Sequence, residues 1–180
     1  MADRTIVGFC GPIGCGKSAA TRHLVNSYRF VKRPFAGPLK DMAAAVGLND
    51  NQLNGNLKET PCELLGGKTP RHFMQTLGTE WGRNCMDGDF WVRLWSMLLP
   101  AGRDIVVDDV RFPNEVKTIR DMGGIIIQLE RRGTGGLAAH ASELQGIKGD
   151  VVLENNRTLD DLYADIDWCL SSFWRGERVA

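Results

Sequence analysis

The sequence predicts an α/β fold built on a three-layer, open parallel sheet. Apolar stretches of strand length alternate with stretches of helical periodicity along the chain. Residues 124–130 form a nearly continuous apolar run, which is typical of parallel strands covered by helices on both faces. A glycine-rich turn at residues 11–18 joins the first predicted strand to the first predicted helix, as in phosphate-binding βα units.

Short apolar stretches bounded by polar residues or glycine predict the strands. The first precedes the glycine-rich turn, and a later one, DIVVDD, ends in two carboxylates. We expect strands at residues 5–10, 30–35, 104–109, 124–130 and 151–153.

Helix-start and helix-stop residues frame the predicted helices. Pro38 lies near the start of one helix, and Gly47 lies at its end. Thr69 is a candidate N-cap followed by Pro70 at the first helical position, and Pro100 stops a later apolar helix. We expect helices at residues 19–25, 38–46, 69–81, 89–99, 113–120 and 159–173.

Two stretches lack a regular period. Residues 48–68 carry Asn, Gly and Pro throughout, which predicts a loop that could hold a short helix. Residues 131–149 are polar and glycine-rich. Ligands of open parallel sheets bind beyond the carboxyl ends of the strands, so either stretch could close over a substrate. At this length, the whole chain, residues 1–180, is expected to form a single domain.

Composition narrows the choice of partner and compartment. Lys and Arg total 22, as do Asp and Glu, so no net field attracts polynucleotide or a membrane surface, and a small substrate is favoured. The five cysteines form no CxxC motif, which favours reduced thiols. With neither a signal peptide nor a membrane-length apolar run in the sequence, we expect a cytoplasmic protein.

Residues 11–18, GPIGCGKS, fit the pattern GxxxxGK[ST] at every fixed position. Gly11, Gly14 and Gly16 would let backbone N–H groups point at phosphate oxygens. Lys17 would reach the β- and γ-phosphates, and Ser18 would place its hydroxyl on Mg²⁺. The alternative is a glycine-rich turn with a surface lysine. Because a strand precedes the motif and a helix follows it, we expect a P-loop protein that binds a nucleoside triphosphate.

Charged residues after two predicted strands could complete the nucleotide-binding site. Asp108 and Asp109 end one strand, where a P-loop protein holds Mg²⁺, and we favour Asp109; solvated carboxylates are the alternative. Arg111 would project into the same cleft. Arg131 and Arg132 open the segment 131–149 and could stabilise a moving phosphoryl group if this segment is a lid. A basic pair on a solvated loop is the other interpretation.

The last strand bears on the choice of nucleotide. Switch GTPases recognise guanine with an Asn-Lys-x-Asp segment after a late strand, whereas this chain has ENNR at residues 154–157. ATP is therefore favoured, and Asn155 is a candidate contact for its base.

Several segments together resemble bacteriophage deoxynucleoside monophosphate kinases of the P-loop nucleoside/nucleotide kinase group. The phosphate loop belongs to a very large superfamily, but GTEWGR and DVRFPNE are far narrower motifs. The matching segments are residues 11–18, 35–40, 71–83, 109–115 and 140–143.

The resemblance implies ATP-dependent phosphorylation of deoxynucleoside 5′-monophosphates to diphosphates for DNA precursor synthesis, with Mg²⁺. It implies an acceptor-binding region at about residues 36–100, a lid at about 131–149 with Arg132 as its arginine, and a possible homodimer in the host cytoplasm. The alternatives are a kinase of another small acceptor, such as dephospho-coenzyme A, and a nonenzymatic ATP-binding adaptor. The candidate acceptor residues are Lys40, Arg71, Gln75, Arg83, Arg111 and Glu115.

Overall fold

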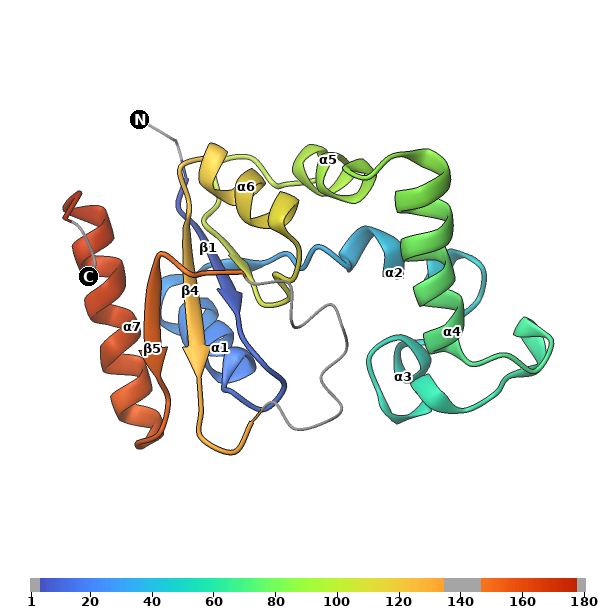
Figure 1. Cartoon of the computed structure of the whole chain (residues 1–180), viewed down its shortest axis with the longest axis horizontal. Helices are drawn as coiled ribbons and strands as arrows, with labels where there is room; N and C mark the ends of the chain where they lie inside the picture. Colours follow the sequence, from blue (N-terminus) through green and yellow to red (C-terminus); the bar gives the residue numbers. More distant parts are fainter. Residues whose placement is uncertain (1–3, 135–146, 178–180) are drawn as a thin grey trace. The chain divides into compact units, whose positions relative to one another are not determined.

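The computed structural model describes residues 4–134 and 147–177. The chain folds into two compact units (Figure 1). The sheet unit comprises Met1–Pro34 and Pro100–Ala180, and the helical unit comprises Phe35–Leu99. The helical unit covers almost the same residues as the range 36–100 in which the sequence places acceptor binding.

The sheet unit contains the predicted parallel sheet, with strand order β2-β3-β1-β4-β5. All neighbouring strands are parallel, and β1 lies in the centre, where Val7 is in register with Val106 of one neighbour and Ile125 of the other. The α/β prediction is therefore confirmed. The strands are β1 Ile6–Cys10, β2 Val31–Lys32, β3 Ile105–Val107, β4 Ile125–Glu130 and β5 Val151–Glu154.

Helices cover both faces of this sheet and make it three-layered (Figure 1). On one face, α1 (Lys17–Tyr28) and α7 (Leu159–Trp174) pack over the strands through a core that includes Leu24, Phe9 and Ile166. On the other face lies α6 (Pro113–Asp121). A Cβ at Gly8 would lie 2.8 Å from the Ile119 side chain, so glycine in β1 permits the close approach of α6.

The edge strand β2 is shorter than the expected 30–35. Proline has no N–H to donate to a strand ladder, and Pro34 follows this strand after one residue. The last bond of the ladder is made by Arg33, whose N–H donates to the Val106 carbonyl at 2.9 Å.

The helical unit is built around one helix that changes its pitch. Thr69 caps α4 through a bond from the His72 N–H, as the sequence predicts. The chain then continues as the wider π-helix η3, so that the expected helix 69–81 extends to Met86. The segment 48–68 holds three short helices. The elements of this unit are α2 Gly37–Ala45, α3 Asp50–Leu53, η1 Asn56–Glu59, η2 Glu63–Leu65, α4 Pro70–Gln75, η3 Thr76–Met86 and α5 Phe90–Met97.

Trp91 of α5 fixes the wide helix in place. Its Nε1 donates to the Gly78 carbonyl at 2.7 Å. A Cβ at Gly82 would lie 2.3 Å from the same Nε1, so only glycine lets the helix approach the indole so closely. The two glycines of the motif GTEWGR therefore have a packing reason, since a Cβ at Gly78 would likewise lie 2.9 Å from the Leu39 side chain.

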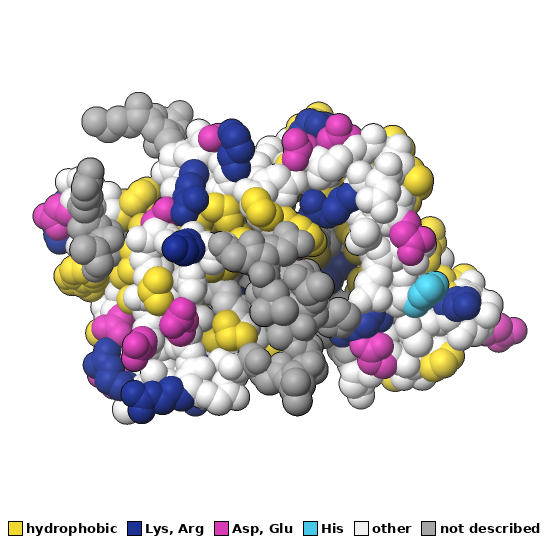
Figure 2. Space-filling model, viewed as in Figure 1, with side chains coloured by type: hydrophobic (Ala, Val, Ile, Leu, Met, Phe, Trp, Pro, Cys, Tyr) yellow, Lys and Arg dark blue, Asp and Glu magenta, His cyan; other side chains and the backbone are white. Residues whose placement is uncertain are grey.

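The surface carries charges of both signs. Figure 2 shows Lys and Arg side chains interspersed with Asp and Glu side chains over the visible face. No helix within 4–134 or 147–177 has the length and apolar character needed to cross a bilayer.

Candidate active site

The glycine-rich turn forms a tight loop between β1 and α1, and we call residues 11–18 the phosphate loop. Gly11, Gly14 and Gly16 have φ angles of 131°, 83° and 112°, values that L side chains rarely adopt. Close neighbours add a second constraint at Gly11, where a Cβ would lie 2.2 Å from the Leu129 carbonyl oxygen. The three glycines are thus required by backbone geometry before any ligand is considered.

Lys17 folds back over the loop that precedes it. Its Nζ donates to the Gly11 carbonyl at 2.6 Å and to the Pro12 carbonyl at 2.8 Å, and lies 3.7 Å from Cys15 Sγ. Ser18, the second residue of α1, is exposed. The first turn of α1 has no acidic residue, so nothing in that turn offsets the positive end of the helix dipole. This arrangement can bind an anion.

Two buried cysteines lie at the phosphate loop, one just before it and one inside it. Cys10 ends β1, and burial raises the pKa of its thiol to about 11. It is therefore neutral near pH 7. Cys15, inside the loop, is fully buried.

Asp108 and Asp109 follow β3 directly, and both are partly buried. Asp108 forms an ion pair with Lys32 of the neighbouring strand β2, at 2.5 Å between Nζ and Oδ2. A metal ion at Asp108 would have to compete with this lysine.

Glu115 stabilises the turn that carries Arg111. Its buried carboxylate accepts bonds from the N–H groups of Arg111 at 2.7 Å and Phe112 at 3.1 Å, at the start of α6. These bonds satisfy N–H groups that a helix start leaves unpaired. The Arg111 side chain is exposed. Glu115 therefore holds the DVRFPNE turn in shape.

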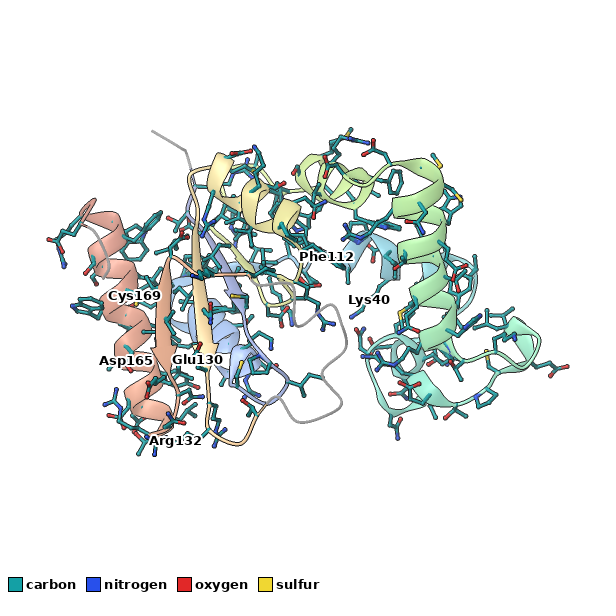
Figure 3. All side chains as sticks on the ribbon, viewed as in Figure 1. Lys40, Phe112, Glu130, Arg132, Asp165 and Cys169 are labelled. Atoms are coloured by element: carbon teal, nitrogen blue, oxygen red, sulfur yellow. The ribbon has the colours of Figure 1, made fainter. Side chains whose placement is uncertain are left out.

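Arg132 lies beyond the carboxyl end of β4 (Figure 3). Its side chain is exposed, and its N–H donates to Asn156 Oδ1 at 2.8 Å. A turn follows in which Thr134 bonds to the Arg131 carbonyl. Most of the expected lid, including His140 of the matching segment 140–143, lies outside the described residues.

Three of the candidate acceptor residues of the helical unit already have partners within that unit. Lys40 of α2 (Figure 3) donates from Nζ to Asn54 Oδ1 at 2.6 Å. Arg71 is ion-paired with Glu59. Arg83 bonds to the Gly88 carbonyl at 3.3 Å. Gln75 is exposed at the end of α4. A ligand phosphate would have to compete for these groups.

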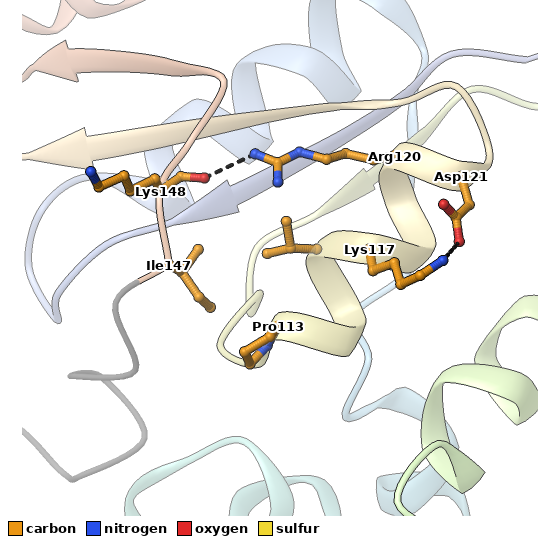
Figure 4. A pocket seen from close by; sticks show the side chains of 7 residues that line it. Pro113, Lys117, Arg120, Asp121, Ile147 and Lys148 are labelled. Atoms are coloured by element: carbon orange, nitrogen blue, oxygen red, sulfur yellow. Dashed lines mark hydrogen bonds and ion pairs between the residues drawn. The ribbon is translucent and has the colours of Figure 1, made fainter.

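A pocket of about 450 Å³ lies beside α6 (Figure 4). Two of its cations have partners: Arg120 bonds to Asp150 at 2.9 Å and to the Lys148 carbonyl at 3.0 Å, and Lys117 pairs with Asp121 at 2.5 Å. No predicted site residue lines this pocket.

Ser18 and Asp109 are the residues that could hold Mg²⁺ together with a bound nucleotide. Among residues 4–134 and 147–177, no cluster of three or more His, Cys, Asp or Glu side chains could hold a metal ion. Mg²⁺ bound with a nucleotide needs only one or two protein oxygen ligands, because phosphates and water supply the others. The hydroxyl of Ser18 and the carboxylate of Asp109 are oxygen donors of this kind.

Side-chain contacts between distant segments were not visible in the sequence. Asn155 was a candidate for contacting the base, yet its Nδ2 donates to the Cys15 carbonyl at 2.9 Å. Asn156 bonds to the Arg132 backbone, and Lys32 to Asp108. In the sequence, the one feature that could have drawn attention to Asn155 and Asn156 is their place in a polar turn directly after the last predicted strand.

Comparison with known proteins fixes the family. A family model described as deoxynucleotide monophosphate kinase matches residues 67–166. A deoxynucleotide monophosphate kinase homologue from Acanthamoeba polyphaga mimivirus is 33% identical over 186 residues, covering 93% of this chain and 96% of that protein. The chain belongs to the deoxynucleotide monophosphate kinase family. The resemblance in the GTEWGR and DVRFPNE segments is thereby confirmed at the level of the family.

One further sequence relative and one solved structure differ in how much they share with this chain. The deoxynucleotide monophosphate kinase of Escherichia phage RB69 is 36% identical over 104 residues, covering 54% of this chain and 43% of the phage enzyme. The APS kinase of Mycobacterium tuberculosis has a TM-score of 0.49 at 13% identity, over 94% of this chain and 98% of that one, a likeness too distant to bear on the site. The family assignment therefore comes from the sequence relatives.

Proposed function

We propose that this member of the deoxynucleotide monophosphate kinase family transfers the γ-phosphate of ATP to a deoxynucleoside 5′-monophosphate, giving a deoxynucleoside diphosphate and ADP for DNA synthesis. The observation that carries the proposal is the phosphate loop with Lys17 at the start of α1. It stands in a chain whose family model and sequence relatives are named deoxynucleotide monophosphate kinase.

Donor binding would rest on the phosphate loop. The N–H groups of the loop and of the first turn of α1 would bind phosphate oxygens. Lys17 would exchange its bonds to the Gly11 and Pro12 carbonyls for bonds to the β- and γ-phosphates. Ser18 and Asp109 would hold Mg²⁺, which neutralises phosphate charge when bound.

The transfer itself needs no general base on the enzyme. The second pKa of a phosphate monoester is about 6, so the acceptor already carries a nucleophilic oxygen at neutral pH. That oxygen would attack the γ-phosphorus while the bond to the β-phosphate oxygen breaks and ADP leaves. Catalysis would then consist of positioning and of positive charge from Lys17, Arg111 and Arg132 on the transferred group.

We assign acceptor binding to the arginines and to Lys40 and Gln75, while Glu115 would act indirectly by holding the turn that carries Arg111. The interaction of Arg71 with Glu59 supports a role for this arginine, because a dianionic phosphate can displace a single exposed carboxylate. The segment that begins at Arg131 would exclude water so that the phosphoryl group reaches the acceptor. We further propose that the enzyme works in the host cytoplasm, as a homodimer.

An acceptor panel tests the function. ADP release would be coupled to NADH oxidation with ATP and each of dAMP, dGMP, dCMP and dTMP, with the four ribonucleotides, and with dephospho-coenzyme A. We expect turnover with one or more deoxynucleotides, and a kcat/KM about 10³-fold lower in the Lys17→Ala variant. Turnover only with dephospho-coenzyme A would assign another kinase activity, and ATP binding without ADP formation under any acceptor would assign an adaptor.

A further inference from the structure

We propose that Asn155 is a positioning residue of the phosphate loop, which aims the backbone N–H of Gly16 at the nucleotide phosphates. This inference rests on the proposed function. It gives Asn155 a role different from the base contact that the sequence suggested.

Asn155 is held rigidly at its own backbone. It follows β5 directly, and its N–H donates to the Glu130 carbonyl of β4 at 2.7 Å. The side chain therefore starts from a fixed point on the sheet. Its amide nitrogen donates to the Cys15 carbonyl at 2.9 Å, across 140 positions of sequence.

This bond determines which way the peptide between Cys15 and Gly16 faces. In a planar trans peptide the C=O and N–H groups point in opposite directions. With the Cys15 carbonyl turned toward Asn155, the Gly16 N–H must point away from Asn155. Without this bond the peptide would lose its side-chain constraint, and on the Gly16 side the backbone tolerates a wide range of φ.

The next peptide is fixed independently. The Gly16 carbonyl accepts the N–H groups of Ala19 at 3.0 Å and Ala20 at 3.1 Å, as the first carbonyl of α1. The Asn155 amide also lies directly against Gly16, where a Cβ would be 2.3 Å from Nδ2. One peptide is thus held by the helix and its neighbour by Asn155.

Two variants isolate the bond. Asn155→Ala removes the amide, and Asn155→Asp keeps the shape but offers a carboxylate, which cannot donate to a carbonyl. Asn156→Ala is the matched control for binding, because Asn156 bonds to the Arg132 N–H and to Glu154 and not to the loop.

The readout is the affinity for ATP and for adenosine, measured by calorimetry and ligand-observed NMR on protein shown to be folded by its melting curve. Losing one hydrogen bond that orders a phosphate-binding group should weaken ATP binding about 3- to 10-fold. We expect this for Asn155→Ala, a larger loss for Asn155→Asp, unchanged adenosine affinity in both, and ATP affinity within about twofold of wild type for Asn156→Ala.

Other results overturn the inference. Equal losses for ATP and adenosine would indicate a base contact or a general structural defect, and unchanged ATP affinity would show that the loop orders itself. A wild-type protein that binds no ATP would instead contradict the proposed function, and with it the inference.

Discussion

The donor side and the acceptor side of the proposed reaction are built on different principles. The phosphate loop in the sheet unit is shaped by backbone constraints: three glycines with positive φ, a helix start and a tether from Asn155. In the helical unit the candidate acceptor groups are long cationic side chains, several already bonded to neighbours such as Asn54 and Glu59.

The difference teaches how each side would respond to its ligand. A cradle made of backbone N–H groups is ordered before the nucleotide arrives, so little conformational entropy is lost on binding. Exposed cations paired with single carboxylates or amides are held only weakly and can change partner. We therefore expect the loss of the phosphate-loop lysine to lower turnover far more than the loss of an acceptor cation.

The largest effect should come from Lys17. We expect Lys17→Ala to lower kcat/KM about 10³-fold, because the variant loses the ammonium expected to stabilise the transferred group. Steady-state kinetics would measure the loss. Lys117→Ala is the control, since this exposed lysine of α6 forms an ion pair with Asp121 on the same helix. Equal activity of the two variants would remove Lys17 from the mechanism.

Arg132 should have the next largest effect. We expect Arg132→Ala to lower kcat about 10²-fold with little change in ATP affinity, as for a group that acts mainly in the transition state. Arg131→Ala, measured beside it, shows which of the two arginines serves the reaction. A parallel loss of kcat and ATP affinity in Arg132→Ala would reassign this arginine to ground-state binding.

The Arg71→Ala variant tests whether the loss of one acceptor-binding cation weakens acceptor binding only in part. We expect Arg71→Ala to raise the acceptor KM about tenfold, the loss of one charge-assisted hydrogen bond to phosphate. Glu59→Gln removes the competing carboxylate and should lower the acceptor KM or leave it unchanged. A higher KM in Glu59→Gln would mean that the ion pair orients Arg71 for binding.

The smallest effect concerns stability. A Cβ at Gly82 would lie 2.3 Å from Trp91 Nε1, so we expect Gly82→Ala to lower the free energy of unfolding by about 1–3 kcal/mol. Gly88→Ala is the matched control, since nothing lies within 4 Å of a Cβ there. Urea titration would measure both. Equal stability of the two variants would contradict the packing reason given for the GTEWGR glycines.

The sequence predicted what is local along the chain. All fixed residues of GxxxxGK[ST] fall within eight positions, and the strand before and helix after it follow from apolar periodicity. The interpretation of the carboxylates at the end of β3 as candidate ligand-binding groups came from the rule that ligands bind beyond strand ends.

Side-chain pairing could not be predicted in the same way. The bond from Asn155 to Cys15 and the ion pair of Lys32 with Asp108 join segments far apart in sequence, and only the packed sheet brings them together. The wide helix η3 was likewise hidden, because its fit depends on the indole of Trp91 in a later helix.

The central claim is that a phosphoryl group passes from ATP to a deoxynucleotide. Incubating the enzyme with ATP labelled with ³²P at the γ-position and each deoxynucleoside monophosphate, then separating the products, tests it most directly. We predict that the label appears in a deoxynucleoside diphosphate in amounts equal to the ADP formed. Label recovered only as inorganic phosphate, or retained entirely in ATP with every deoxynucleotide, would contradict the account.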